Sequence, residues 1–153
     1  MFNKAAKGYT FSENFFSDMG AYAARNGDPN YLSMILFSLS LTVVGVTFIL
    51  YYLTIPSLFK SDRLSYFISL LGSLFAIAGS LCLIGTGLTP SDLVLESHKF
   101  FANNIFYSFL CTSFFYTLVI FKSNSIKKRY AIGYLIFFVS IFFYVGVLNF
   151  GPS

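Results

Sequence analysis

Long apolar runs without a single charge dominate the pattern of this chain. All charged residues fall within the intervals 4–28, 60–63, 92–99 and 122–129, which leaves 29–59, 64–91, 100–121 and 130–153 free of charge. A helix needs about 20 apolar residues to cross roughly 30 Å of hydrocarbon. None of these runs shows the ~10-residue alternating segments of β-barrel strands. The pattern predicts an all-α integral membrane protein with spans near 31–55, 64–88, 100–121 and 130–150. Short connections predict an up-down four-helix bundle.

Composition agrees with this pattern. The chain is 56% hydrophobic and 10% charged, has a mean hydropathy of +0.72, and holds 21 Phe and 11 Tyr. Soluble domains carry about 25% charged residues. A water-soluble globule of this length could not bury so many aromatic rings, so a bilayer is the expected solvent.

The first 30 residues differ from the rest. Phe11, Phe15, Met19 and Tyr22 recur at helical spacing with polar residues between them. This predicts a short amphipathic helix on the outer membrane surface, not a cleavable signal peptide. Residues 27–30 predict a turn that caps the first span through Asp28 or Asn30. The chain therefore divides into an outer segment, 1–30, and a transmembrane bundle, 31–153.

Small side chains mark the second span as the central packing helix. They stand at four-residue spacing on two neighbouring stripes: Gly72, Ala76 and Ser80, and Ser65, Ser69 and Ser73. Small residues let helix backbones approach closely in lipid. The two cysteines, Cys82 and Cys111, lie within predicted spans without a metal-binding spacing, so inert buried thiols are expected.

The basic residues gather at helix ends. The loops 56–63 and 122–129 hold six of the ten cations, and the positive-inside bias places both loops in the cytoplasm. Both termini are then outside. This distribution excludes a nucleic-acid surface, and Lys127, Lys128 and Arg129 are expected to fix topology and attract anionic lipid.

The loop before the third span offers a helix start or a reactive site. Thr89 and Pro90 suit the N-cap and first helical positions, and Asp92 would then accept backbone N–H bonds of its own helix. The alternative is that Asp92 joins a polar site. Asp92 and His98 are six residues apart, roughly 240° around a helix. They cannot pair within one helix, so His98 would have to face another element.

His98 is the single histidine and carries the candidate chemistry. It can be an interfacial side chain bonded to a backbone carbonyl. It can also be an acid/base group or metal ligand, because ionisable groups at membrane depth are costly. The candidate catalytic residues are His98, Asp92, Asp18 and Ser17, and the candidate metal ligands are His98, Asp18 and Asp92. No nucleotide, hydrolase, zinc-protease or haem motif is present, so no cofactor is expected.

Two motifs resemble a known family. Residues 14–20, NFFSDMG, resemble an N-x-x-S-D/E-L-G loop. Residues 87–92, GLTPSD, followed by His98, resemble a G-x-x-P-x-D…H loop. The chain is thus similar to the bacterial multi-pass proteins of domain-of-unknown-function family 998, and more distantly to DRAM-like membrane proteins. The resemblance implies a bacterial inner-membrane location, about six spans with this chain truncated at both ends, and one outer site holding Ser17, Asp18, Asp92 and His98.

These observations favour a lipid-binding or accessory membrane component of unknown biochemical activity. Its expected partners are membrane lipids and either further copies of itself or another membrane protein. The alternative is a membrane-embedded enzyme that acts on a lipid or small molecule at the outer leaflet through the Asp/His site. A transporter is disfavoured, because no charged residue lies within a predicted span.

Overall fold

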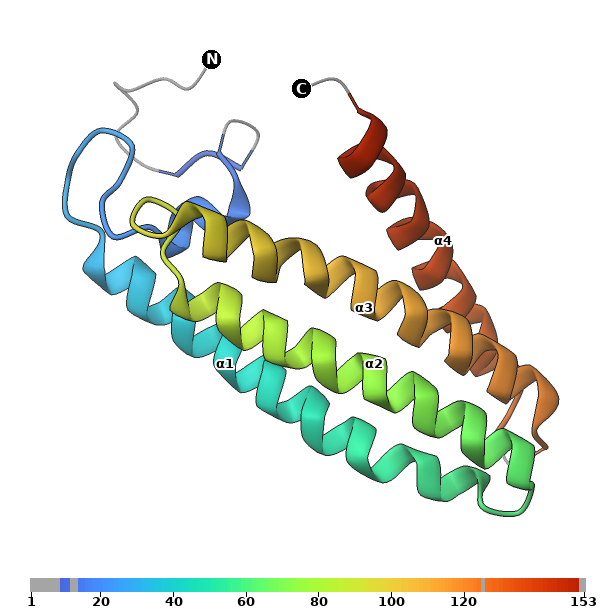
Figure 1. Ribbon diagram of the computed structural model, residues 1–153. Helices are drawn as coiled ribbons and strands as arrows, with labels where there is room; N and C mark the ends of the chain where they lie inside the picture. Colours follow the sequence, from blue (N-terminus) through green and yellow to red (C-terminus); the bar gives the residue numbers. More distant parts are fainter. Residues whose placement is uncertain (1–8, 12–13, 125, 152–153) are drawn as a thin grey trace.

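The computed structural model describes residues 9–11, 14–124 and 126–151, and these form four antiparallel α-helices (Figure 1). The α-helices are α1 (Tyr31–Thr54), α2 (Arg63–Leu88), α3 (Leu95–Lys122) and α4 (Arg129–Phe150), and the short 3-10 helices are η1 (Phe16–Gly20) and η2 (Ile55–Phe59). Each α-helix is long and apolar enough to cross a membrane. The predicted all-α bundle is confirmed, and the chain is a multi-pass membrane protein.

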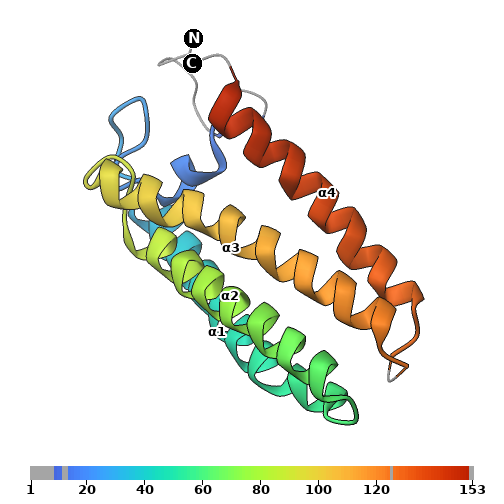
Figure 2. The same cartoon turned by 45° about the vertical axis from the view of Figure 1, so that its right-hand side comes forward.

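The helices are not equivalent within the bundle. α2 packs against α1 on one side and α3 on the other, and α3 also packs against α4. In the most apolar window of each helix, 33% of α2 and 39% of α3 is buried, against 11% of α1 and of α4. Figures 1 and 2 show α4 diverging from α3 towards its C-terminal end. α1 and α4 therefore present most of their surface outwards.

Small residues make α2 the central helix, as predicted. The buried positions of α2 are Ser65, Ser69, Gly72, Ser73, Ala76, Gly79, Ser80, Thr86 and Gly87. A Cβ atom on Gly79 would lie 2.9 Å from Cβ of Ser108 on α3. On the other side of α2, where it packs against α1, a Cβ atom on Gly45 of α1 would lie 2.9 Å from the backbone oxygen of Ser80. Backbones approach this closely only where side chains are absent or small.

A fully buried tyrosine, Tyr116 of α3, joins the first half of α2 to the second half of α3. The Tyr116 hydroxyl lies 2.7 Å from Oγ of Ser73 and donates to the backbone oxygen of Ser69 at 3.3 Å. Its ring stacks on Tyr134 of α4 at 5.3 Å and contacts Tyr52 of α1 at 5.4 Å. A polar group inside an apolar bundle is costly unless it is hydrogen-bonded. Tyr116 can therefore be buried, because its hydroxyl is hydrogen-bonded and its ring packs against other aromatic rings.

Asp62 fixes the start of α2. Its carboxylate accepts hydrogen bonds from the backbone N–H of Leu64 and of Ser65 and from the Ser65 hydroxyl. It also pairs with Nζ of Lys122, at the end of α3, at 3.0 Å. The Ser65 hydroxyl and then the Lys122 ammonium hold the pKa of the Asp62 carboxyl well below its ordinary value of 3.8.

The predicted N-terminal amphipathic helix is wrong for the described residues. Residues 1–8, 12 and 13, and the C-terminal residues 152 and 153, lie outside the described part of the chain. Between residues 14 and 30 the one helical element is η1, and it is followed by a loop with an isolated bridge between Ala23 and Pro29. Side chains from elsewhere bind the backbone of residues 18–23, so those groups are not available for helical hydrogen bonds.

Replacing Gly45 by Ala is expected to destabilise the bundle by about 1–3 kcal/mol, because the new Cβ meets backbone that cannot rotate away. Unfolding in detergent can be followed with a thiol-reactive dye, since Cys82 and Cys111 are free and half-buried. Gly146→Ala is the matched control, because a Cβ there meets nothing within 4 Å. Equal unfolding temperatures for the two variants would contradict the close-packing account.

Asp62 is expected to make stability depend on acid pH. Its folded-state pKa lies below the unfolded value. Its contribution is therefore complete above about pH 4 and is lost as the pH falls through the folded pKa. Unfolding midpoints in detergent should fall more steeply below about pH 4 for the natural chain than for Asp62→Asn. Glu96→Gln, which changes an exposed carboxylate, serves as the control. Parallel curves for all three proteins would rule out this role.

Candidate functional site

The predicted site residues lie at one end of the bundle, here called the capped end. It consists of η1, residues 21–30 and the α2–α3 connection, residues 89–94 (Figure 1). The opposite end, here called the basic end, consists of η2, the residues up to Arg63, and the α3–α4 connection.

The prediction that Thr89, Pro90 and Asp92 start the third helix is wrong. α3 begins at Leu95, and residues 90–94 form a turn in which the Pro90 oxygen accepts from Leu93 N and Val94 N. The Thr89 hydroxyl bonds back to the Gly85 oxygen of α2 at 2.8 Å. Thr89 therefore completes the end of α2, and Asp92 is released from any capping role.

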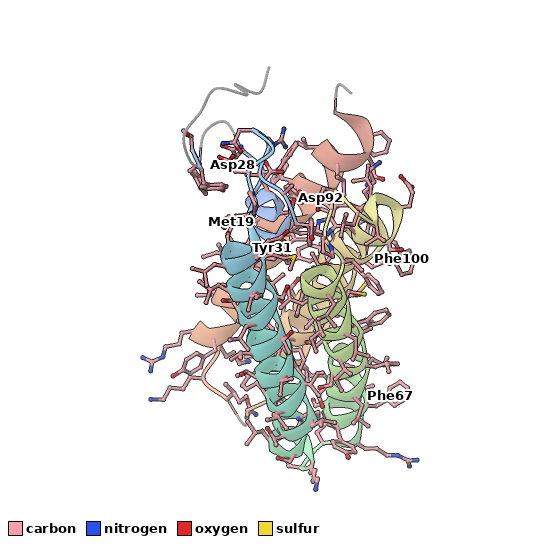
Figure 3. The ribbon with its side chains drawn as sticks, turned by 90° about the vertical axis from the view of Figure 1, so that its left-hand side faces the viewer. Met19, Asp28, Tyr31, Phe67, Asp92 and Phe100 are labelled. Atoms are coloured by element: carbon pink, nitrogen blue, oxygen red, sulfur yellow. The ribbon has the colours of Figure 1, made fainter. Side chains whose placement is uncertain are left out.

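Asp92 binds the backbone of the N-terminal segment instead. Its Oδ1 accepts from Tyr22 N and its Oδ2 accepts from Ala23 N, both at 2.9 Å. Figure 3 shows Asp92 beside this segment, at the same end of the bundle as Met19 and Tyr31. A carboxylate that accepts two neighbouring N–H groups is a charge-assisted pair, stronger than a neutral hydrogen bond. The contact joins segments 70 residues apart in the sequence.

Asp18 forms an ion pair with Arg25 inside the cap. Its carboxylate receives two hydrogen bonds from Arg25, at 2.8 and 2.9 Å, and a third from Phe15 N at 2.9 Å. The Arg25 guanidinium also lies over the Phe15 ring. Ser17, which precedes Asp18 in η1, is half-buried. Asp18 thus holds η1 to the loop that follows it.

Asn30 has the N-cap position of α1, as one of the two predicted alternatives, but its side chain does not cap the helix. It donates from Nδ2 to the backbone oxygens of Ala21 at 2.9 Å and Met19 at 3.3 Å. The Ser33 hydroxyl donates to the Met19 oxygen at 2.8 Å. α1 therefore binds the carbonyl groups of the cap, whereas Asp92 binds its amides.

His98 is buried, with 6% of its surface exposed. Its Nδ1 lies 2.6 Å from the Thr89 oxygen. A carbonyl oxygen can only accept, so Nδ1 carries the proton in this contact. This is the carbonyl-bonded state that the sequence offered as one alternative. Among the described residues, no hydrogen bond joins His98 to Asp18 or Asp92.

Together these contacts form what we call the clasp: Asp18, Arg25, Asn30, Asp92 and His98. It brings the NFFSDMG and GLTPSD motifs to one end of the bundle and uses their charged groups to hold backbone. Within the part of the chain that the structure describes, no group of three or more His, Cys, Asp or Glu side chains could hold a metal ion. Catalytic or metal-binding roles for these residues stay predictions. The role of Arg25 was not predicted, because its pairing with Asp18 depends on how the loop between them folds.

An open apolar groove of about 640 Å³ lies at the basic end. α1 and η2 line it with Tyr51, Thr54, Ile55, Ser57 and Leu58, α3 and its connection with Ile120 and Ile126, and α4 with Tyr130, Gly133, Tyr134 and Phe137. Its volume falls within the range of ligand pockets, about 300–1,000 Å³. The groove was not predicted. Gly133 and the tyrosines near the helix ends are visible in the sequence, but they indicate a groove only once α1 and α4 are known to line the same space.

No protein-family model, no curated protein and no solved structure matches this chain. The resemblance to domain-of-unknown-function family 998 and to DRAM-like proteins therefore stays an expectation from the two motifs.

Replacing Asp92 by Ala is expected to loosen the cap without unfolding the helices. Two N–H groups lose their acceptor, which should cost about 1 kcal/mol at this exposed site and speed amide exchange of Tyr22 and Ala23 roughly fivefold. Hydrogen exchange in detergent measures this directly. Glu96→Ala is the control, because its ion pair with Lys99, at 3.3 Å, is exposed. Unchanged exchange at Tyr22 and Ala23 in Asp92→Ala would show that the clasp does not hold the cap.

Proposed function

We propose that this protein is a non-catalytic, lipid-binding component of the membrane, and that the groove at the basic end holds a lipid acyl chain. The observation that carries the proposal is the groove itself. It is lined mainly by apolar and aromatic side chains and lies between α1 and α4, the two helices with the most outward surface. In a bilayer such a space is filled by hydrocarbon, because water has too few polar partners there.

The capped end supports a structural role for the residues that an enzyme would need. An acid/base group must reach the proton that it transfers. Asp92 is occupied by two backbone amides, Asp18 by Arg25, and the Nδ1 atom of His98 by the Thr89 carbonyl. No described contact favours the enzyme alternative over this account, so we propose the accessory role.

The proposal also covers the orientation of the chain in the membrane and its family membership. We place the basic end in the cytoplasm, because Lys60, Arg63, Lys122 and the 127–129 cluster lie there. Membership of domain-of-unknown-function family 998, with a bacterial inner-membrane location, is supported by the two motifs, which lie at the same end of the bundle. Labelling of single cysteines introduced in the 122–129 loop would contradict this orientation if they react from outside.

Filling the groove tests lipid binding. Gly133 lines the groove, and a Cβ there meets nothing within 4 Å, so Gly133→Leu fills space without clashing with protein. In vesicles that contain phosphatidylcholine with a photoactivatable acyl chain, crosslinking to the groove residues of α4 should fall several-fold.

The matched control is Gly146→Leu. It lies on the same helix, also has nothing within 4 Å of its Cβ, and is not part of the groove. Crosslinking at the groove should match that of the natural chain. Equal labelling of the groove in Gly133→Leu and Gly146→Leu would exclude a lipid site there.

A further inference from the structure

We propose that the groove selects anionic phospholipid, and that Lys128 and Arg129 at the start of α4 bind its head group. This inference rests on the proposed function, because it assigns the head group of the lipid whose acyl chain occupies the groove. The occupant is a phospholipid of the leaflet at the basic end.

The position of these cations relative to the groove is the first argument. Ile126 and Tyr130 both line the groove, and residues 127–129 form the backbone between them. Lys128 is the N-cap residue of α4 and Arg129 is its first residue, and both side chains are exposed. Exposed basic residues therefore stand next to lining residues of an apolar space, which matches a lipid with a charged head and an apolar chain.

Arg129 is held at that rim by a lining residue. Its guanidinium lies 5.2 Å from the centre of the Tyr130 ring, and Nη2 lies 3.4 Å from the Tyr130 hydroxyl. Stacking on an aromatic face leaves the edge of a guanidinium available to oxygen acceptors. A phosphate oxygen is such an acceptor, and the planar fork of arginine binds it with two parallel hydrogen bonds.

The local charge balance is the second argument. The segments 55–63 and 122–130 contain six basic residues and a single acidic residue, Asp62. Asp62 is engaged by Lys122 and by the start of α2, away from the groove lining. The positive charge at the groove rim thus has no carboxylate of these segments beside it, and an anionic head group complements it.

A general role in fixing membrane topology predicts a different result. If the cations act only through the summed potential of the membrane surface, any two of them at the basic end should be equivalent. Lys60 and Arg63 lie at the same end and are exposed, but neither they nor their immediate neighbours in the sequence line the groove, whereas Arg129 directly precedes and contacts the lining residue Tyr130. The double variant Lys60→Gln/Arg63→Gln therefore matches Lys128→Gln/Arg129→Gln in charge and differs in position.

The experiment is competition in vesicles for the crosslink at the groove residues of α4. Photoactivatable phosphatidylcholine is the label, and unlabelled phosphatidylglycerol or phosphatidylcholine is the competitor. With the natural chain, phosphatidylglycerol should compete about tenfold better, the order of magnitude that two cations near an anionic head group supply. The preference should disappear in Lys128→Gln/Arg129→Gln and persist in Lys60→Gln/Arg63→Gln. Arg129→Lys keeps the charge but loses the planar fork, so it should retain only part of the preference.

The outcomes separate this inference from the function on which it rests. Equal competition by the two lipids, or an equal loss of preference in both double variants, overturns head-group selection while lipid binding stands. A crosslink that Gly133→Leu leaves unchanged overturns lipid binding itself. Capture of a second polypeptide at the groove in place of lipid overturns both. Thiol-dye unfolding of each variant identifies any that fails to fold, and Arg129→Gln alone then replaces the double variant.

Discussion

Close approach between helix backbones is the constraint on which this structure depends. Lipid tails are as apolar as the side chains that face them, so burying leucine between two membrane helices gains little. Association then depends on dispersion contacts and on a few buried hydrogen bonds. The small face of α2 supplies the short separations, and Tyr116 supplies a hydrogen bond and a large ring packed against Gly72. α4 has no such face towards α2 and joins the bundle through α3.

At the capped end, the corresponding requirement is that backbone polar groups find hydrogen-bond partners. Residues 16–30 fold over the bundle with little helix of their own, and their amides and carbonyls would otherwise depend on water. Asp92 accepts from two amides, and Asn30 and Ser33 donate to carbonyls of the same segment. The charged residues that attract attention in the sequence are thereby used to hold backbone. A functional interpretation of such motifs has to exclude this use first.

Local signals made the membrane helices predictable. The charge-free runs gave all four spans, and the spacing of Gly72, Ala76 and Ser80 gave the central role of α2. The sequence did not reveal that Asp92 binds residues 22 and 23, because that partner lies about 70 positions away. The start of α3 was misplaced because Thr89 and Asp92 fit a helix cap locally, whereas Thr89 ends α2 by bonding to Gly85 and Asp92 binds the distant residues 22 and 23. The groove depends on four separate segments and has no local pattern.

The single extensive interface of α4 links the groove to the thickness of the surrounding bilayer. A membrane helix responds to the surrounding hydrocarbon thickness chiefly by tilting, within the limits that its packing against neighbouring helices sets. Among the described α-helices, α1 packs extensively only on α2 and α4 only on α3, so each of these outer helices has one extensive helix neighbour. We therefore expect a thicker or thinner bilayer to alter the inclination of α1 and α4, and with it the width of the groove that both helices line. On the proposed function, lipid composition would then act on this protein mechanically as well as through the lipid that the groove holds.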